Sequence, residues 1–124
     1  MPDIEKMTSA VHAYVEGFAK GDPAKISALF APDATVEDPI GAPIRHGRAA
    51  IHAFYTESMQ TGAKLTINGP IRVGADHAAF AFSVNLHFGG SDKRVDVIDT
   101  FRFNDDNEIT EMRAFWGPGN MRGF

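Results

Sequence analysis

Two long stretches of alternating apolar and polar residues, joined by Gly89-Gly90, constrain the fold of this chain most strongly. Apolar side chains recur at every second position from 78 to 88, and the same period continues beyond the glycines to Phe103. A period of two is typical of a strand with one buried face, and a glycine pair between two such strands favours a tight turn. The sequence therefore predicts a long antiparallel hairpin with one apolar face.

Helical spacing of apolar residues predicts three helices in the N-terminal half of the chain. The first runs from Ile4 to Phe18, and Gly21 ends it. Asp22-Pro23 is typical of a helix N-cap followed by proline at the first helical position, which predicts a short second helix. A third helix is expected from about Arg48 to Thr61. The apolar face of the second helix would consist of Ile26, Leu29 and Phe30.

Shorter strands complete the predicted sheet. Residues 34–38 alternate ahead of Pro39, residues 65–73 form a strand interrupted near Gly69-Pro70, and a last strand carries Met112, Ala114 and Trp116. Helices followed by hairpin-linked strands indicate an α+β fold, in which three helices cover one face of a mostly antiparallel sheet and enclose a space. A length of 124 residues predicts a single domain, 1–124.

Composition excludes several classes of protein. Twelve Lys and Arg against 16 Asp and Glu give a net charge of −4, whereas nucleic-acid binding needs a basic excess. The absence of Cys excludes disulfides, thiolate metal sites and a thiol nucleophile, and the five His form no close metal-ligand pair. Charges interrupt the first twenty residues, and no apolar run could span a bilayer. We therefore expect a cytoplasmic protein without a metal site, a nucleic-acid partner or a membrane segment.

Asp99 is the most unusual residue in this pattern, because it lies on the apolar face of its strand between Val97 and Phe101. An unpaired carboxylate in such a place costs several kcal/mol, and the group normally becomes protonated instead. A buried neutral carboxylic acid is a hydrogen-bond donor. Pairing of Asp99 with a buried Arg or with backbone amides is the alternative.

Tyr14 and Tyr55 both lie on apolar helix faces, and Asp38 ends a strand whose other inward residues are apolar. Each phenol alone could be a core aromatic with a satisfied hydroxyl, and Asp38 alone could initiate a turn before Pro39. Together with Asp99, however, these residues would gather two carboxyls and two phenols among ten Phe and one Trp. Such a set favours a general base facing neutral donors that meet a developing oxyanion.

The residues around these positions resemble a known family. The segments are Ala13-Tyr14, Asp33 to Pro39, Ala53-Phe54-Tyr55, Phe80-Ala81-Phe82 and Ile98 to Phe103. From about Met7 to Asn120 the chain resembles the bacterial ketosteroid isomerases, within the nuclear-transport-factor-2-like (SnoaL-like) superfamily of cone-shaped α+β folds. The helices and strands are common to the superfamily, whereas Tyr14, Asp38 and Asp99 with these flanks are more specific to the isomerases.

The resemblance implies isomerisation of 3-oxo-Δ5-steroids to 3-oxo-Δ4-steroids without a cofactor or a metal. Asp38 would move a proton from C4 to C6, while Tyr14 and a protonated Asp99 would hydrogen-bond the C3 oxygen of the dienolate. This family is itself a known case of a carboxylic acid kept neutral so that it can donate a hydrogen bond. Tyr55 would hydrogen-bond Tyr14 from behind. The steroid slot would be lined by Phe54, Phe82, Val84, Phe101, Met112 and Trp116.

The resemblance also implies a homodimer that acts in steroid and lipid metabolism. Phe30 stands where some relatives carry another tyrosine, which would shorten the phenol network, and the tail 117–124 is expected to shape the pocket mouth. The alternatives are a polyketide cyclase, dehydratase or epoxide hydrolase on the same scaffold, or a non-catalytic protein that binds a hydrophobic ligand. Arg102 lies on the face opposite Asp99, which disfavours an epoxide hydrolase with an inward Arg.

Overall fold

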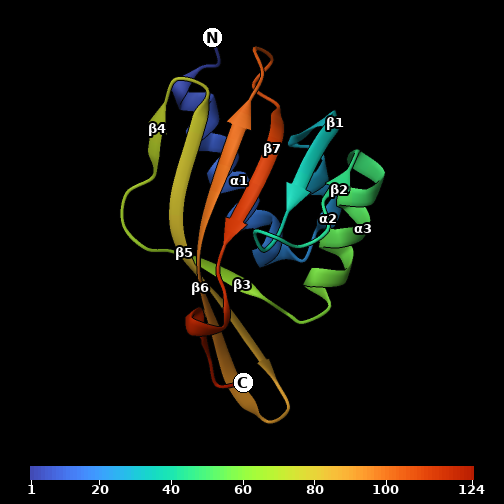
Figure 1. Ribbon diagram of the computed structural model, residues 1–124, viewed down its shortest axis with the longest axis vertical. Coiled ribbons are helices and arrows are strands. Elements are labelled where there is room, and N and C mark those ends of the chain that lie inside the picture. The colour runs from blue at the N-terminus through green and yellow to red at the C-terminus, as the bar shows by residue number, and fades with distance from the viewer.

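The computed structural model of the protein describes residues 1–124, apart from the side chain of Phe88. Figure 1 shows helices and strands that alternate in the first half of the chain and strands that fill the second half. The elements are α1 (Ile4–Lys20), α2 (Pro23–Ser27), β1 (Phe30–Glu37), β2 (Arg45–His46), α3 (Arg48–Met59), β3 (Lys64–Ile67), β4 (Arg72–Gly74), β5 (His77–Phe88), β6 (Ser91–Phe103), β7 (Ile109–Phe115), the 3-10 turn η1 (Pro118–Asn120) and β8 (Met121–Arg122).

The predicted hairpin is confirmed and forms the long axis of the sheet. Strands β5 and β6 pair antiparallel without interruption from His77 opposite Arg102 to Phe88 opposite Ser91. The sheet order is β2-β1-β7-β6-β5-β3, with β4 paired to β5 and β8 paired to β6. The β1–β7 pair is parallel and the other pairs are antiparallel. The expected α+β fold with a curved, mostly antiparallel sheet is therefore confirmed.

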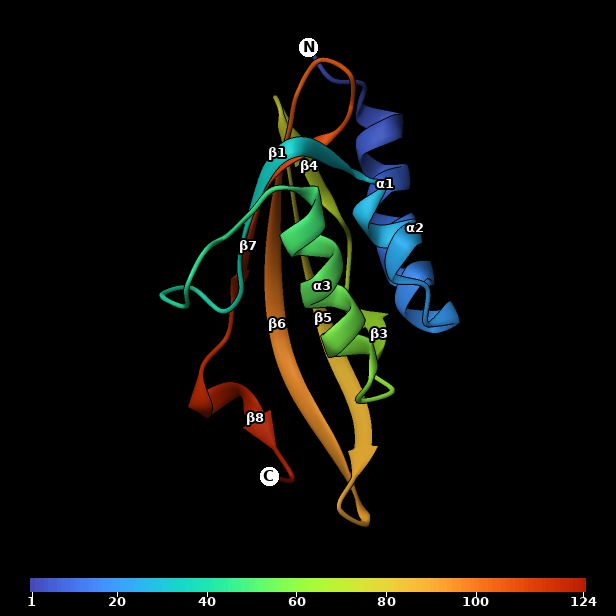
Figure 2. The ribbon, with the colours of Figure 1, turned by 90° about the vertical axis from the view of Figure 1, so that its right-hand side faces the viewer.

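The helices lie over one face of this sheet, and their ends are capped by local chemistry. Figure 2 shows α1 and α2 along one side of the curved strands. The Asp3 carboxylate accepts hydrogen bonds from the Glu5 and Lys6 amides, and Gly21 ends α1 with a φ of 61°, where glycine is favoured. The Asp22 carboxylate caps α2 by accepting from the Lys25 amide. None of the described helices is long and apolar enough to cross a membrane.

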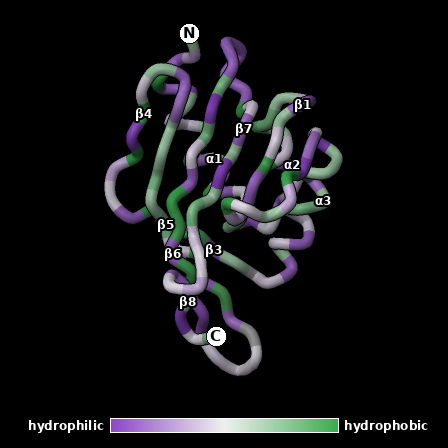
Figure 3. Tube along the Cα trace, viewed as in Figure 1, coloured by the Kyte–Doolittle hydropathy of each residue, from purple (hydrophilic) through white to green (hydrophobic). Residues whose placement is uncertain are grey.

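The apolar core lies between α1, α3 and the inward face of the sheet. Figure 3 shows hydrophobic and hydrophilic residues following one another along β6, as the period of two requires. From Val95 to Phe103, every second residue of β6 is buried while its neighbours are exposed or half-buried. The buried set on this strand is Val95, Val97, Asp99, Phe101 and Phe103.

One predicted boundary is wrong, and strand pairing explains it. Phe30, expected on the second helix, begins β1, because it pairs with Ile109 of β7 while the Leu29 carbonyl accepts the Ile109 amide. The interruption expected near Gly69-Pro70 is confirmed, since Gly69 takes a φ of 85° before Pro70 and separates β3 from β4. Strands β3 and β4 then pair with different parts of β5.

Gly17 makes a close contact that yields a prediction about stability. A Cβ placed on Gly17 of α1 would lie 2.5 Å from Cγ1 of the buried Ile26 of α2. Helix propensity favours alanine over glycine by about 1 kcal/mol, whereas overpacking a core costs about 1–3 kcal/mol. We therefore expect Gly17→Ala to lower the free energy of unfolding in urea. Ala19→Gly, on the exposed side of the same helix, is the control for propensity alone, and a stabilised Gly17→Ala protein would contradict the prediction.

Candidate active site

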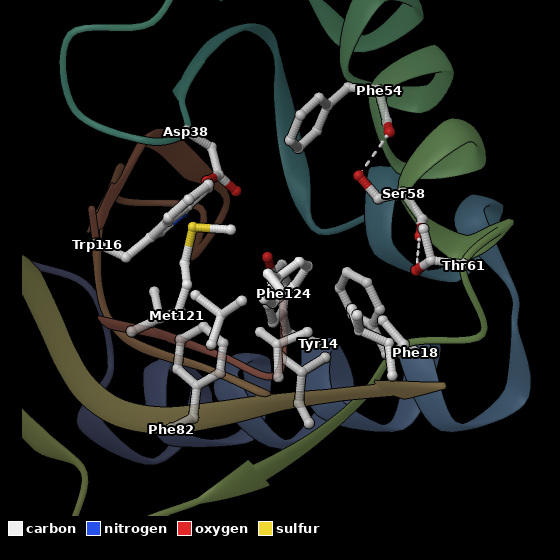
Figure 4. Close-up of a pocket in the computed structure, with 16 residues that line it drawn as sticks. Tyr14, Phe18, Asp38, Phe54, Ser58, Thr61, Phe82, Trp116, Met121 and Phe124 are labelled. Carbon is white, nitrogen blue, oxygen red and sulfur yellow. Dashed lines mark hydrogen bonds between the residues drawn. The ribbon is translucent and has the colours of Figure 1, made fainter. Parts of the chain in front are cut away.

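A cavity of about 380 Å³ lies between the helices and the inward face of the sheet. Figure 4 shows Asp38 and Trp116 side by side, across the cavity from Phe18. A volume of this size accommodates a small organic ligand, and apolar walls with a few polar groups are typical of such sites. The cavity is lined by Tyr14, Phe18, Asp38, Phe54, Ser58, Thr61, Ala63, Leu65, Phe82, Val84, Leu86, Val95, Val97, Trp116, Met121 and Phe124.

Asp38 follows the last residue of β1, and its carboxylate faces the cavity. The indole Nε1–H of Trp116 donates a hydrogen bond of 2.8 Å to Oδ1 of Asp38. Burial raises the pKa of Asp38 above its ordinary value, while the Trp116 hydrogen bond and the positive charge of Arg45 act in the opposite direction. The Arg45 guanidinium lies 4.6 Å from the ring centroid of Phe54, another wall residue. Asp38 therefore has the position and the basicity of a candidate proton acceptor.

Tyr14 and Tyr55 form the pair of phenols that the sequence suggested. Their hydroxyl oxygens lie 3.0 Å apart in a hydrogen bond, and the two side chains are 2% and 1% exposed. Burial raises both pKa values well above 10, with the charges of neighbouring acids acting in the same direction. Phe30 packs against Tyr55, with the two ring centroids 6.1 Å apart. Because Phe30 has no hydroxyl, the hydrogen-bonded network contains only the phenols of Tyr14 and Tyr55. Tyr14 thus presents a neutral O–H at the cavity wall.

Asp99 is 1% exposed, and neither of its carboxyl oxygens has a hydrogen-bond partner. Its neighbour across the hairpin is Phe80, and Phe101 follows it on the same face; both rings pack against Tyr14. Burial raises the pKa of Asp99 well above its ordinary value, and the negative charge of Asp38 raises it further. Tyr14 lies close enough to oppose this shift, although not in hydrogen-bonding geometry. Burial therefore favours the neutral, protonated form of Asp99, whose carboxyl oxygens have no hydrogen-bond partner in the folded chain.

The structure brings most of the predicted residues to one place. Phe54, Phe82, Val84 and Trp116 line the cavity with Tyr14 and Asp38. Phe101 and Met112, both fully buried, are not among the lining residues, and neither is Asp99, so these three lie behind the wall that Tyr14 presents.

Sequence reasoning missed further residues of the wall. Val95 and Val97 share the face of Asp99, so the period of two could have identified them. Met121 and Phe124 belong to the tail 117–124, which is expected at the pocket mouth, but the sequence there has no regular period that singles out these two residues; pairing of β8 with β6 places this segment beside the cavity. Among the described residues, no group of three or more His, Asp or Glu side chains could hold a metal ion.

Comparisons with known proteins agree with this geometry. The SnoaL-like domain family matches residues 11–112. The chain is 46% identical over 117 residues to a steroid Delta-isomerase of Nocardioides simplex, with 94% of each protein covered. Among solved structures it is similar to the epoxide hydrolase/cyclase-like enzyme SalBIII, which was described for pyran ring formation in the polyether salinomycin. That likeness has a TM-score of 0.89 and 26% identity and covers 98% of both chains.

These similarities define the class of protein. The chain belongs to the SnoaL-like family and, within it, to the ketosteroid isomerases. It is an enzyme of the isomerase class. The alternative of a non-catalytic binding protein is thereby excluded.

The buried Asp99 leads to a prediction about stability and pH. Its pKa is raised in the folded protein, so above about pH 4 the unfolded chain releases this proton while the folded protein keeps it. The folded protein therefore becomes less stable as pH rises, until pH reaches the pKa of Asp99 in the folded state. Over this range the folding equilibrium constant falls by at most about tenfold for each pH unit. We expect the stability of Asp99→Asn relative to the wild type to increase steadily from pH 4 upward in urea titrations.

The raised pKa of Asp38 also makes stability fall as pH rises. Because Asp38 is present in both the wild type and Asp99→Asn, its effect largely cancels when the two are compared. Asp106→Asn, on an exposed turn, is the matched control and should follow the wild-type profile. Parallel profiles for the wild type and Asp99→Asn would contradict a protonated, buried Asp99.

Proposed function

We propose that this enzyme converts 3-oxo-Δ5-steroids to 3-oxo-Δ4-steroids by moving one proton from C4 to C6 within the bound substrate. The single observation that carries the proposal is that one apolar cavity brings together the carboxyl of Asp38 and the phenol of Tyr14, with the buried carboxyl of Asp99 beside the phenol. The substrate class is supported by the 46% identity to a steroid Delta-isomerase.

Each step has a residue suited to it. The Asp38 carboxylate accepts the C4 proton, the electron pair of that C–H bond forms the C3–C4 double bond of a dienolate that keeps its C5–C6 double bond, and negative charge develops on the C3 oxygen. Tyr14 and Asp99 then donate hydrogen bonds to that oxygen, which stabilises the dienolate because both donors are neutral and water is excluded. Protonated Asp38 returns the proton to C6, so no atom is gained or lost. This protonation leaves the double bond at C4–C5 and restores the C3 carbonyl. No cofactor or metal is needed in this proposal.

The surrounding residues support these roles. The Trp116 N–H fixes one oxygen of Asp38 at 2.8 Å, which leaves the other available toward the cavity. Tyr55 fixes the Tyr14 hydroxyl at 3.0 Å. Phe54, Phe82 and Val84 would pack against the flat faces of the steroid rings. Phe101 and Met112, behind the wall, would hold Asp99 and its neighbours in position.

The likeness to SalBIII raises a second candidate, the opening or cyclisation of an epoxide on the same scaffold. The lower identity, 26% against 46%, favours the isomerase. The described wall of the cavity also contains no Arg or Lys, and Arg102 points away from it to pair with Asp76.

We also propose that the enzyme is a homodimer and that it acts in the cytoplasm. The exposed pair Ile98 and Phe115, opposite each other on the outer sheet face, supports the dimer.

Asp38→Asn tests the assignment of the base. The amide oxygen can still accept the Trp116 N–H, so the substitution removes the basic group with little change of shape. We expect kcat for 5-androstene-3,17-dione to fall by about two to four orders of magnitude, with little change in binding of the conjugated product. The ultraviolet absorbance of the enone measures turnover, and quenching of the single Trp measures binding.

Asp33→Asn, at an exposed carboxylate on β1, is the matched control. No conversion by the wild-type protein would overturn the isomerase proposal. Undiminished turnover by Asp38→Asn would overturn the role of Asp38 alone.

Asp99→Asn and Asp99→Leu separate hydrogen-bond donation from packing. The amide keeps an N–H donor, whereas leucine keeps the volume and removes the donor. Loss of one oxyanion donor costs about 10²–10³ in kcat, so we expect Asp99→Leu to lose that much and Asp99→Asn clearly less. Steady-state kinetics on the same steroid measure both. Equal losses would mean that Asp99 is structural and donates nothing to the substrate.

A further inference from the structure

The wall of the cavity contains two hydroxyl side chains that the isomerase proposal does not use. Tyr14, Asp38 and Trp116 form one polar cluster, and the remaining polar side chains among the described lining residues are Ser58 and Thr61. Figure 4 shows Ser58 and Thr61 across the cavity from Asp38 and Trp116. We call Ser58 and Thr61 the hydroxyl pair, and it gives the otherwise apolar slot a second polar patch.

The hydroxyl pair lies away from the buried phenols, toward solvent. Tyr55, whose hydroxyl meets that of Tyr14, is 1% exposed, whereas Ser58 is half-buried and Thr61 is exposed. Ser58 follows Tyr55 by nearly one turn of α3, and Thr61 lies in the turn after the helix, about 10 Å from Tyr55 along the helix axis. From the phenols, the cavity therefore opens toward Thr61.

The protons of both hydroxyls are already used within the chain. The Ser58 hydroxyl donates to the Phe54 carbonyl at 2.9 Å, and the Thr61 hydroxyl donates to the Ser58 carbonyl at 2.8 Å (Figure 4). A hydroxyl has one proton to donate and two lone pairs that accept. Because a carbonyl oxygen can only accept, the direction of both bonds is fixed. The hydroxyl pair therefore offers a ligand lone pairs and no proton.

We propose that the hydroxyl pair is a subsite for a hydrogen-bond donor at the ring-D end of the substrate, so that the enzyme prefers 3-oxo-Δ5-steroids with a 17β-hydroxyl over those with a 17-ketone. This inference rests on the proposed function, because the C3 oxygen must lie at Tyr14 and Asp99 for ring D to extend toward Thr61. A 17β-hydroxyl would donate to Ser58 or Thr61.

A 17-ketone matches this patch poorly. Its oxygen would bring a further acceptor against the lone pairs of the hydroxyl pair, and a hydrogen bond to it would first require the loss of a bond to a backbone carbonyl. A steroid with ketones at both ends could also present either end to the donors Tyr14 and Asp99. A 3-oxo-17β-hydroxy steroid matches both patches only in the direction that places C4 near Asp38.

The test compares two steroids that differ only at C17. Binding uses the conjugated products 17β-hydroxyandrost-4-en-3-one and androst-4-ene-3,17-dione, followed by quenching of the single Trp, and kinetics use the two Δ5 substrates. The measured quantity is the ratio of the two dissociation constants. We expect the wild type to bind the hydroxy steroid about three- to tenfold more tightly, as one hydrogen bond allows.

The double variant Ser58→Ala/Thr61→Val removes both acceptors and should abolish the preference for the hydroxy steroid. Thr61→Ser keeps an acceptor and should keep the preference. Thr56→Val is the matched control, because the Thr56 hydroxyl donates to the His52 carbonyl at 2.8 Å on the same helix but does not line the cavity. Using a ratio removes any effect of a loosened helix, because such an effect weakens the binding of both steroids.

No preference in the wild type, or an unchanged ratio in the double variant, would overturn the donor subsite. An equal change of the ratio in Thr56→Val would also overturn it, since the effect would then come from the helix. If the subsite fails in either way while 5-androstene-3,17-dione is isomerised, the proposed function stands. If the wild type prefers the hydroxy steroid in the binding measurement but isomerises neither Δ5 steroid, the proposed function fails instead.

Discussion

The carboxyl group of Asp99 sits among buried aromatic rings with no partner for either oxygen, and the character of the site depends on this placement. In such surroundings the charged form of a carboxyl is strongly disfavoured, so the group keeps its proton and becomes a donor. A fold normally avoids this cost by pairing a buried acid with a base. Here the unsatisfied group lies beside the Tyr14 hydroxyl, where a ligand oxygen could satisfy both.

Asp38 carries the same carboxyl group as Asp99, but its surroundings favour the charged form more than those of Asp99 do. It is half-buried, it accepts the Trp116 N–H, and Arg45 lies near enough to favour its charged form. Burial raises the pKa of both acids, but hydrogen bonding and a nearby cation oppose the shift at Asp38 more than at Asp99. A pair of acids held in different environments can divide the roles of proton acceptor and hydrogen-bond donor.

The long hairpin carries this chemistry because its register is continuous. Each step of two residues along β6, from Asp99 to Val97 and Val95, places another buried side chain on the same inward face. The tail completes the wall, since β8 pairs with β6 at Val95 and brings Met121 and Phe124 to the cavity.

The sequence by itself determined the α+β class, the long hairpin and the inward position of Asp99, because a period of two or of 3.6 residues records which face of an element is buried. It also indicated that Tyr14 and Tyr55 point inward. Only the tertiary structure decided that Trp116 donates a hydrogen bond to Asp38 across 78 residues, that Phe101 does not line the cavity, and which residues of the tail reach it. Periodicity is a local property of the chain, whereas contacts between distant segments depend on how whole elements pack, and packing is a property of the folded molecule.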